Sequence, residues 1–131
     1  MTLSAPPHDG CHLIAELYGC SHLSDLGLIE QAMTGAAKAA GATLLDLKMH
    51  GFGAGHGVTG VALLAESHIS IHTWPEHGYA AVDIFLCAPW HDAEAGLGVL
   101  AAALAARRIE QRRIVRGYAA ATVSPETSPV N

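Results

Sequence analysis

Hydrophobic and polar residues alternate in several short segments of this chain, as they do in β-strands that bury one face. Over residues 12–18, the positions of Leu13, Ala15 and Leu17 alternate with those of His12, Ile14, Glu16 and Tyr18. Comparable segments at residues 43–49, 58–65, 68–74, 80–87 and 112–118 predict five further strands. We therefore expect most of the regular structure to be β-sheet.

Two other segments repeat hydrophobic residues at helical spacing. The first follows a capping residue, Ser24, and ends before the helix stop Gly41. Its apolar stripe consists of Leu26, Ile29, Met33, Ala37 and Ala40. The second follows Asp92 and carries Leu97, Leu100 and Leu104. These patterns predict one helix after the first strand and one before the last.

The order of elements is strand, helix, four strands, helix, strand, which predicts an α+β fold. Short connections between the four central strands favour a mainly antiparallel sheet with both helices on one face. Only 15% of the residues are charged, fewer than a monomer of this size normally carries. We therefore expect the second face to pack on the sheet of another copy, giving an α/β/β/α sandwich in a homodimer.

Length and composition narrow the class of protein. The 131 residues suit a single domain over 1–131, with loose termini at 1–10 and 120–131. A formal net charge of −5 disfavours nucleic acid as a partner, and no apolar run is long enough to cross a membrane. Three cysteines cannot all pair, and no secretory signal is evident, so we expect a cytoplasmic protein.

The segment from Glu66 to Glu76 carries more chemistry than a strand needs for packing. Alternation over residues 68–74 places two imidazoles and a hydroxyl on one face of the strand, and the residues on that face are His68, Ser70, His72 and Trp74. His68, His72 and Cys87 could bind zinc, although no fourth ligand is evident. Alternatively, the histidines are structural and are satisfied by hydrogen bonds within the sheet.

A third interpretation is nucleophilic chemistry, with Ser67 or Cys87 as the nucleophile and a histidine as the base. Ser67 and His72 have opposite parity, so on one regular strand they would point to opposite faces. We therefore expect Ser67 to lie at a bend, where its hydroxyl could attack the carbonyl group that precedes it. This interpretation favours self-processing over hydrolysis of an external substrate.

These residues resemble the short bacterial and archaeal S-adenosylmethionine decarboxylase proenzymes. The resemblance rests on Glu66-Ser67-His68, on the segment from Ile71 to Glu76, and on Asp83 and Cys87 downstream. It extends to His12-Leu13-Ile14-Ala15-Glu16, Ile29-Glu30-Gln31 and Gly41-Ala42-Thr43. Most of residues 11–118 is therefore covered, and the central motif is long and chemically unusual.

The resemblance implies a pyruvoyl enzyme that is made by internal serinolysis. The Ser67 hydroxyl would attack the carbonyl of Glu66, and elimination and hydrolysis would follow. Cleavage would leave chains of residues 1–66 and 67–131, with a pyruvoyl group at the new terminus. That group would form a Schiff base with the substrate amine and accept electrons as carbon dioxide leaves.

Roles for the other residues also come from the resemblance. His72 would be the base in processing, assisted by the hydroxyl of Thr59, where relatives commonly have Ser. Cys87 would protonate the carbanion after decarboxylation. Three further roles implied by the resemblance concern the substrate. Phe52 would stack on adenine, and Glu76 would bind the ribose hydroxyls. Glu16 is a candidate to bind the positively charged end of the substrate.

The resemblance implies decarboxylation of S-adenosylmethionine for spermidine biosynthesis, but the sequence leaves two alternatives open. The same machinery could act on L-ornithine or L-arginine, because this chain departs from the family pattern at Gly55-His56-Gly57 and Leu86-Cys87-Ala88. An uncleaved relative that regulates a working partner is an alternative of another class. The loop with Gly51, Gly53, Gly55 and Gly57 is expected to let the backbone approach a ligand or a neighbouring strand.

Overall fold

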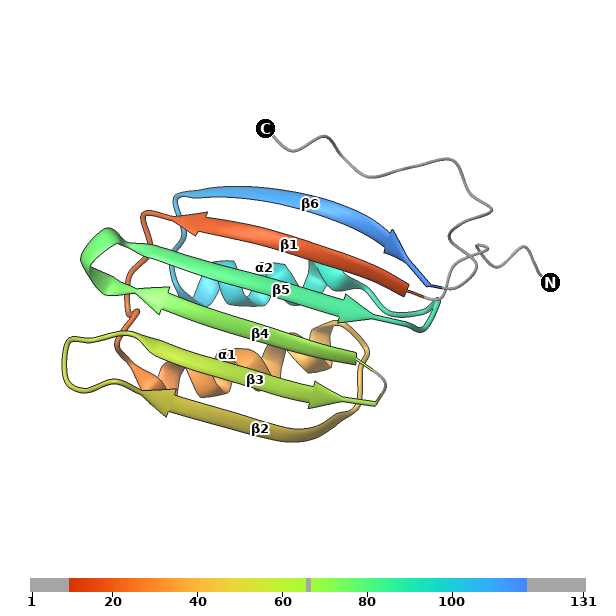
Figure 1. Cartoon of the computed structure of the whole chain (residues 1–131), viewed down its shortest axis with the longest axis horizontal. Helices are drawn as coiled ribbons and strands as arrows, with labels where there is room; N and C mark the ends of the chain where they lie inside the picture. The colour runs from red at the N-terminus through yellow and green to blue at the C-terminus, as the bar shows by residue number, and fades with distance from the viewer. Residues whose placement is uncertain (1–9, 66, 118–131) are drawn as a thin grey trace.

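The computed structural model describes residues 10–65 and 67–117, which form one six-stranded sheet and two helices (Figure 1). The elements in chain order are β1 (Gly10–Tyr18), α1 (Leu26–Ala39), β2 (Leu44–Gly51), β3 (Val58–Leu64), β4 (Ser67–Trp74), the short 3-10 helix η1 (Pro75–His77), β5 (Tyr79–Leu86), α2 (Ala93–Ala103) and β6 (Arg108–Arg116). The strand order is β2-β3-β4-β5-β1-β6, and every neighbouring pair is antiparallel. The predicted α+β class is confirmed.

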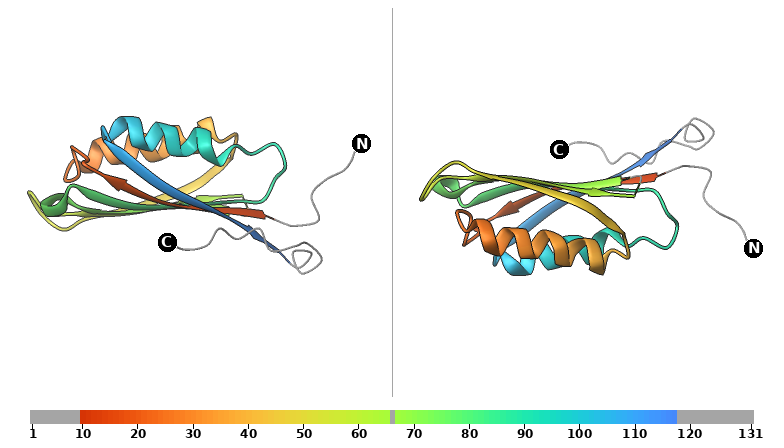
Figure 2. Two further views of the ribbon diagram at one scale, coloured as in Figure 1. Left: turned by 90° about the horizontal axis from the view of Figure 1, so that it is seen from above. Right: turned by 90° about the horizontal axis from the view of Figure 1, so that it is seen from below.

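Both helices cover the same face of the sheet, as the two side views show (Figure 2). The core lies between the helices and the inward residues of the strands, and its fully buried side chains include Leu13, Leu17, Ile29, Met33, Ile69, Ile71, Ile84 and Leu100. The opposite face of the sheet carries the polar side chains of β4 and is called the open face below. No helix within the described residues is long and apolar enough to span a membrane.

The helix boundaries follow the capping chemistry. Asp25, one residue after the predicted Ser24, caps α1, because its carboxylate accepts a hydrogen bond from Leu28 N at 3.0 Å. Asp92 caps α2 as predicted, accepting from Ala95 N at 3.0 Å. Gly41 follows the C-cap of α1 with φ of 78°, a conformation that favours glycine, so the predicted helix stop is also confirmed.

Strand β6 differs most from its predicted range of 112–118. It begins at Arg108 and pairs with β1 along its whole length, from Tyr18 opposite Arg108 to Gly10 opposite Arg116. The early part of this edge strand is polar and exposed, so hydrophobic alternation did not reveal it. Gly10 belongs to β1 rather than to a loose arm, and the rest of both predicted loose termini lies outside the described residues.

Candidate active site

Ser67, the predicted nucleophile, is the first residue of β4. It pairs with Leu64, the last residue of β3, so residues 65 and 66 alone connect the two strands. The Ser67 hydroxyl donates a hydrogen bond to the carbonyl oxygen of Ala65 at 3.2 Å. The expected bend at Ser67 is therefore wrong, since Ser67 is already part of the strand. Glu66, on the other side of the predicted cleavage site, lies outside the described residues.

Cys87, the predicted proton donor, lies at the same end of the sheet as Ser67. It directly follows β5, and the register places His68 opposite Phe85 on the neighbouring strands. Ser67 and Cys87 therefore both lie where β4 begins and β5 ends, and we call this region the cleavage end. Cys87 is half-buried, and none of the three cysteines, all within the described residues, forms a disulfide.

His72, the predicted base, pairs with Thr59 across strands β3 and β4. The two residues are directly opposite each other, and the Thr59 hydroxyl lies 3.1 Å from His72 Nδ1. This is hydrogen-bonding distance, so the hydroxyl can fix the orientation of the imidazole and exchange a proton with it. The structure brings together the two residues that were expected to act as a pair.

Phe52 and Glu76 lie beside this pair. A hollow of about 330 Å³ is lined by Phe52, His56, Gly57, Thr59, His72, Thr73, Trp74 and Glu76. Phe52 is 60% exposed and makes an edge contact with the ring of His50, and Glu76 is carried by η1. We call the region of Phe52, Thr59, His72 and Glu76 the loop end. It contains most of the residues that were predicted to hold the substrate.

Gly57 shows why the glycine loop has its composition. A Cβ atom at Gly57 would clash with the carbonyl oxygen of Thr73, so only glycine allows the loop to lie this close to β4. The Thr73 hydroxyl accepts a hydrogen bond from Val58 N at 2.8 Å and donates one to Leu23 O at 2.7 Å. The expected approach to a neighbouring strand is confirmed, and it positions Thr59 and His72.

The cleavage end and the loop end lie apart within one chain. Ser67 begins β4 and His72 lies near its other end, so at about 3.3 Å per residue their Cα atoms are about 17 Å apart. A general base must come within about 3 Å of the proton that it removes. His72 therefore cannot act on Ser67 of the same chain. The same spacing places His68 and His72 about 13 Å apart, which excludes one zinc ion bound by both.

Glu16 lies on the open face, level with the loop end. It is opposite Ala81 of β5, which is in turn opposite His72 of β4. Its carboxylate accepts a hydrogen bond from the hydroxyl of Tyr79. Burial, together with this hydrogen bond and the charge of Glu16, raises the pKa of Tyr79 to about 12. Tyr79 is thus held as a neutral donor to the carboxylate.

A polar cluster that was not evident from the sequence lies on the open face around Asp83. Asp83 Oδ2 lies 2.6 Å from His12 Nε2 and 2.9 Å from His68 Nε2, and Oδ1 accepts a hydrogen bond from Ser70. Burial alone would raise the pKa of Asp83, but the hydrogen bonds from Ser70, His12 and His68 outweigh burial and lower it. Asp83 is therefore ionised at neutral pH.

The contacts of His12 favour one tautomer of its imidazole ring. The guanidinium of Arg116, which has only donors, lies 3.0 Å from His12 Nδ1. His12 Nδ1 is therefore the acceptor, and its Nε2 carries the proton that is donated to Asp83. His12, His68 and Asp83 each offer a ligand atom within 4.8 Å of the others. The donor at Nε2 and the nearby guanidinium favour hydrogen bonding over cation binding at this cluster.

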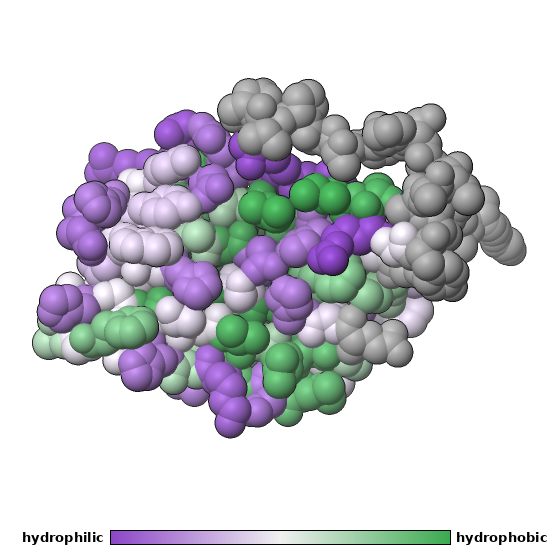
Figure 3. All heavy atoms as spheres, viewed as in Figure 1, coloured by the Kyte–Doolittle hydropathy of each residue, from purple (hydrophilic) through white to green (hydrophobic). Residues whose placement is uncertain are grey.

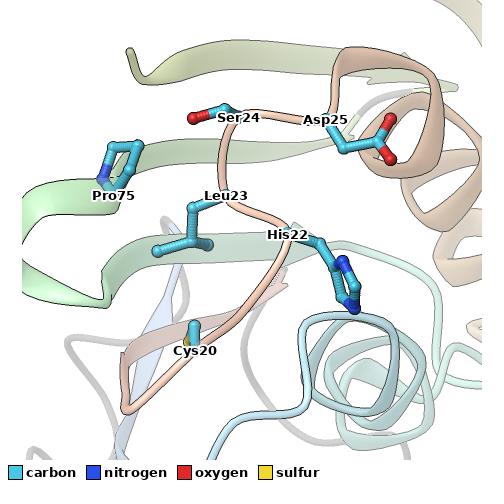
Figure 4. A pocket seen from close by; sticks show the side chains of 6 residues that line it. All are labelled: Cys20, His22, Leu23, Ser24, Asp25 and Pro75. Carbon is cyan, nitrogen blue, oxygen red and sulfur yellow. The ribbon is translucent and has the colours of Figure 1, made fainter. Parts of the chain in front are cut away.

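A second hollow, of about 460 Å³, lies near the start of α1 and is lined by Cys20, His22, Leu23, Ser24, Asp25 and Pro75 (Figure 4). It contains none of the predicted site residues. Burial raises the pKa of the Cys20 thiol, which makes it a poor nucleophile at neutral pH. We therefore assign the chemistry to the open face and not to this hollow.

Comparison with known proteins agrees with this geometry. The family model of S-adenosylmethionine decarboxylase matches residues 11–117. A curated S-adenosylmethionine decarboxylase proenzyme of Parasynechococcus marenigrum is 49% identical over 123 residues, covering 92% of this chain and 95% of the relative. Another, of Thermomicrobium roseum, is 44% identical over 108 residues, covering 82% of this chain and 93% of the relative.

The fold agrees as well. The crystal structure of the adenosylmethionine decarboxylase from Aquifex aeolicus superposes with a TM-score of 0.76 at 36% identity, covering 94% of this chain and 98% of that chain. The family model and the shared fold together identify a self-processing carboxy-lyase. More particularly, the chain belongs to the S-adenosylmethionine decarboxylase family, which confirms the resemblance seen in the sequence.

Proposed function

We propose that this chain cleaves itself between Glu66 and Ser67, and that the product decarboxylates S-adenosylmethionine to supply spermidine biosynthesis. The observation that carries the proposal is the position of Ser67, in a family of pyruvoyl enzymes. Ser67 follows a connection of only two residues between paired strands, which keeps its hydroxyl close to the preceding backbone. The residues present fit the formation of a pyruvoyl group from this serine.

The cleavage uses groups of the chain and one water molecule. The Ser67 oxygen attacks the Glu66 carbonyl carbon, and the peptide bond is replaced by an ester as the proton moves from oxygen to nitrogen. A base then removes the Ser67 Cα proton, and the Cβ–O bond breaks with release of the Glu66 carboxylate. Water replaces the nitrogen of the resulting enamine as ammonia, leaving a pyruvoyl group on residue 67.

We assign the base to His72 with the support of Thr59. Their distance of 3.1 Å supports the assignment, because the hydroxyl can hold the imidazole in one orientation. Since about 17 Å of strand separates His72 from Ser67 in one chain, the base for each Ser67 belongs to a second copy. This requirement is the main support for a dimer.

The open face supplies a surface for that dimer. Hydrophobic side chains lie there in patches among polar ones (Figure 3), and Leu63 is 45% exposed and Trp74 39% exposed. In a two-fold dimer each residue contact occurs twice with the partners exchanged. With the two-fold axis perpendicular to the strands, two packed open faces would place each cleavage end against the loop end of the partner. The result is an α/β/β/α homodimer of processed protomers with two sites.

The pyruvoyl group supplies an electron-accepting carbonyl for decarboxylation of a bound amine. Cys87, at the same end of the sheet as Ser67, donates the proton that replaces carbon dioxide on the substrate. Phe52 stacks on the adenine, and Glu76 accepts hydrogen bonds from the ribose hydroxyls. Glu16, oriented by Tyr79, faces the positive end of the substrate.

Substrate assays test the proposal. The purified protein is incubated with S-adenosylmethionine, L-ornithine or L-arginine, and release of carbon dioxide is measured. We expect turnover of S-adenosylmethionine, because the loop end offers an aromatic ring and a carboxylate suited to a nucleoside. Turnover of ornithine or arginine alone would contradict this substrate. An uncleaved protein without activity would favour a regulatory relative.

A further inference from the structure

Self-cleavage would turn Ser67, the first residue of β4, into the end of a chain. Before cleavage, the connection of residues 65 and 66 holds Ser67 beside Leu64. After cleavage this covalent link is absent, and the first residue of a chain frays unless other contacts hold it. Pairing with β5 starts only at His68, so the backbone of residue 67 has a strand partner on one side. The reactive group would sit on this weakly held residue.

The side chain of His68 holds the strand immediately after that residue. Its Nε2 lies 2.9 Å from Asp83 Oδ2, and its ring lies 5.9 Å from the ring of Phe85. Asp83 is itself fixed by His12 and Ser70, and its carboxylate is ionised, which strengthens the hydrogen bond. His68 is thus tied to a carboxylate on the neighbouring strand β5, which His12 of β1 and Ser70 of β4 also hold in place.

We propose that the hydrogen bond between His68 and Asp83 is an anchor that holds the new amino terminus, and with it the pyruvoyl group, after the chain has been cut. Both are positioning residues, since neither needs to touch the substrate. The inference rests on the proposed self-cleavage and adds a role that appears only afterwards. In the uncut chain the β3–β4 connection restrains the same residues, so the anchor contributes little there.

His12 provides a matched control. It makes the same type of hydrogen bond to the same oxygen of Asp83, at 2.6 Å, but it belongs to β1 and is remote from the cut in the sequence. The variants His68→Ala and His12→Ala each remove one imidazole from the cluster. Only His68→Ala removes a contact of the new chain end. Comparison of the two variants therefore distinguishes loss of the anchor from a general loosening of the cluster.

The test compares amide hydrogen exchange at residues 69–71 in cut and uncut protein. The uncut background is Ser67→Ala, which lacks the nucleophile. In self-cleaved protein, His68→Ala should speed exchange at these amides by at least about tenfold, which corresponds to about 1.4 kcal/mol. In the uncut background the same change should alter exchange by less than about twofold. His12→Ala should affect the cut and uncut forms equally, and His68→Gln, whose amide still donates, should restore most of the protection.

Other results would overturn the anchor. An equal effect of His68→Ala in cut and uncut protein would give His68 a merely structural role, and no effect in cut protein would leave the end held by other contacts. Failure of His68→Ala to cleave would place its role before the cut. If that variant does not fold, Asp83→Asn in both backgrounds must show the same dependence on cleavage. A wild-type chain that never cleaves would instead contradict the proposed function.

Discussion

Two inactive variants of this protein should restore self-cleavage when they are combined in one dimer. Ser67→Ala removes the nucleophile and His72→Ala removes the base, so neither protein should cleave alone. In a mixed dimer, however, the intact Ser67 of one chain meets the intact His72 of the other. The basis is the spacing along β4, which separates the two residues by about 17 Å within a chain.

The expected yield follows from the two-fold symmetry. When both variants are co-expressed in equal amounts and pair at random, half of the His72→Ala chains have a Ser67→Ala partner. About half of the His72→Ala chains, and about a quarter of all chains, should therefore be cut. Intact mass spectrometry distinguishes the two variants, so the assay also shows which chain was cut. Only the chain that retains Ser67 should yield fragments.

The mixed-dimer experiment has a matched control, and two results would contradict the proposed roles. Co-expression of Ser67→Ala with the wild-type chain should leave the Ser67→Ala chains intact. If the wild-type chain cleaves itself but the two variants together do not, the base does not come from a partner copy, and the proposed arrangement of the open faces is wrong. Cleavage of His72→Ala alone would remove His72 from the reaction.

Four further predictions concern single residues. Cys87→Ala should still cleave itself but release carbon dioxide at least about 100-fold more slowly, as expected for loss of a general acid; normal turnover would exclude Cys87 as the donor. Thr59→Ala should slow self-cleavage while Thr59→Ser leaves it near the wild-type rate, and equal time courses on gels would contradict a role for the hydroxyl. Gly57→Ala should lower the free energy of unfolding in urea by about 1–3 kcal/mol because its Cβ meets the Thr73 carbonyl. Gly98→Ala in α2 is the control: apart from its chain neighbours and the backbone of its own helix, no atom lies within 4 Å of the added Cβ, so it should stabilise by about 0.5–1 kcal/mol. Finally, the lowered pKa of Asp83 means that its ionised form stabilises the fold above its unfolded pKa of about 3.9. That stabilisation should disappear as the pH falls through the lower folded pKa, and Asp83→Asn should flatten this part of the stability curve.

The sequence predicts the faces of the strands well because burial follows a period of two. Ile69 and Ile71 are fully buried, and the alternate residues of β4 lie on the open face as expected. Pairs within one hairpin also follow from such patterns once the register is known, as for Thr59 and His72. Edge strand β6 was harder to delimit, because a polar, exposed strand has little hydrophobic alternation.

Relationships between distant strands could not be predicted. The cluster at Asp83 joins residues of β1, β4 and β5, and β1 lies next to β5 only because the chain crosses over to the far side of the sheet. The sequence indicated only that His12, His68 and Asp83 face outward. The strand register is needed to show that they contact one another. The separation of Ser67 from His72 was implicit in their positions on one strand, but its consequence for a dimer depends on the shape of the sheet.

Intact mass spectrometry of the purified wild-type protein is the most direct test of self-cleavage. We expect two chains, residues 1–66 and 67–131, with a pyruvoyl group in place of Ser67 at the start of the second. The Ser67→Ala variant should give one chain of full length under the same conditions. A single wild-type chain of full length, or a cut at any other bond, would contradict self-cleavage at Glu66–Ser67.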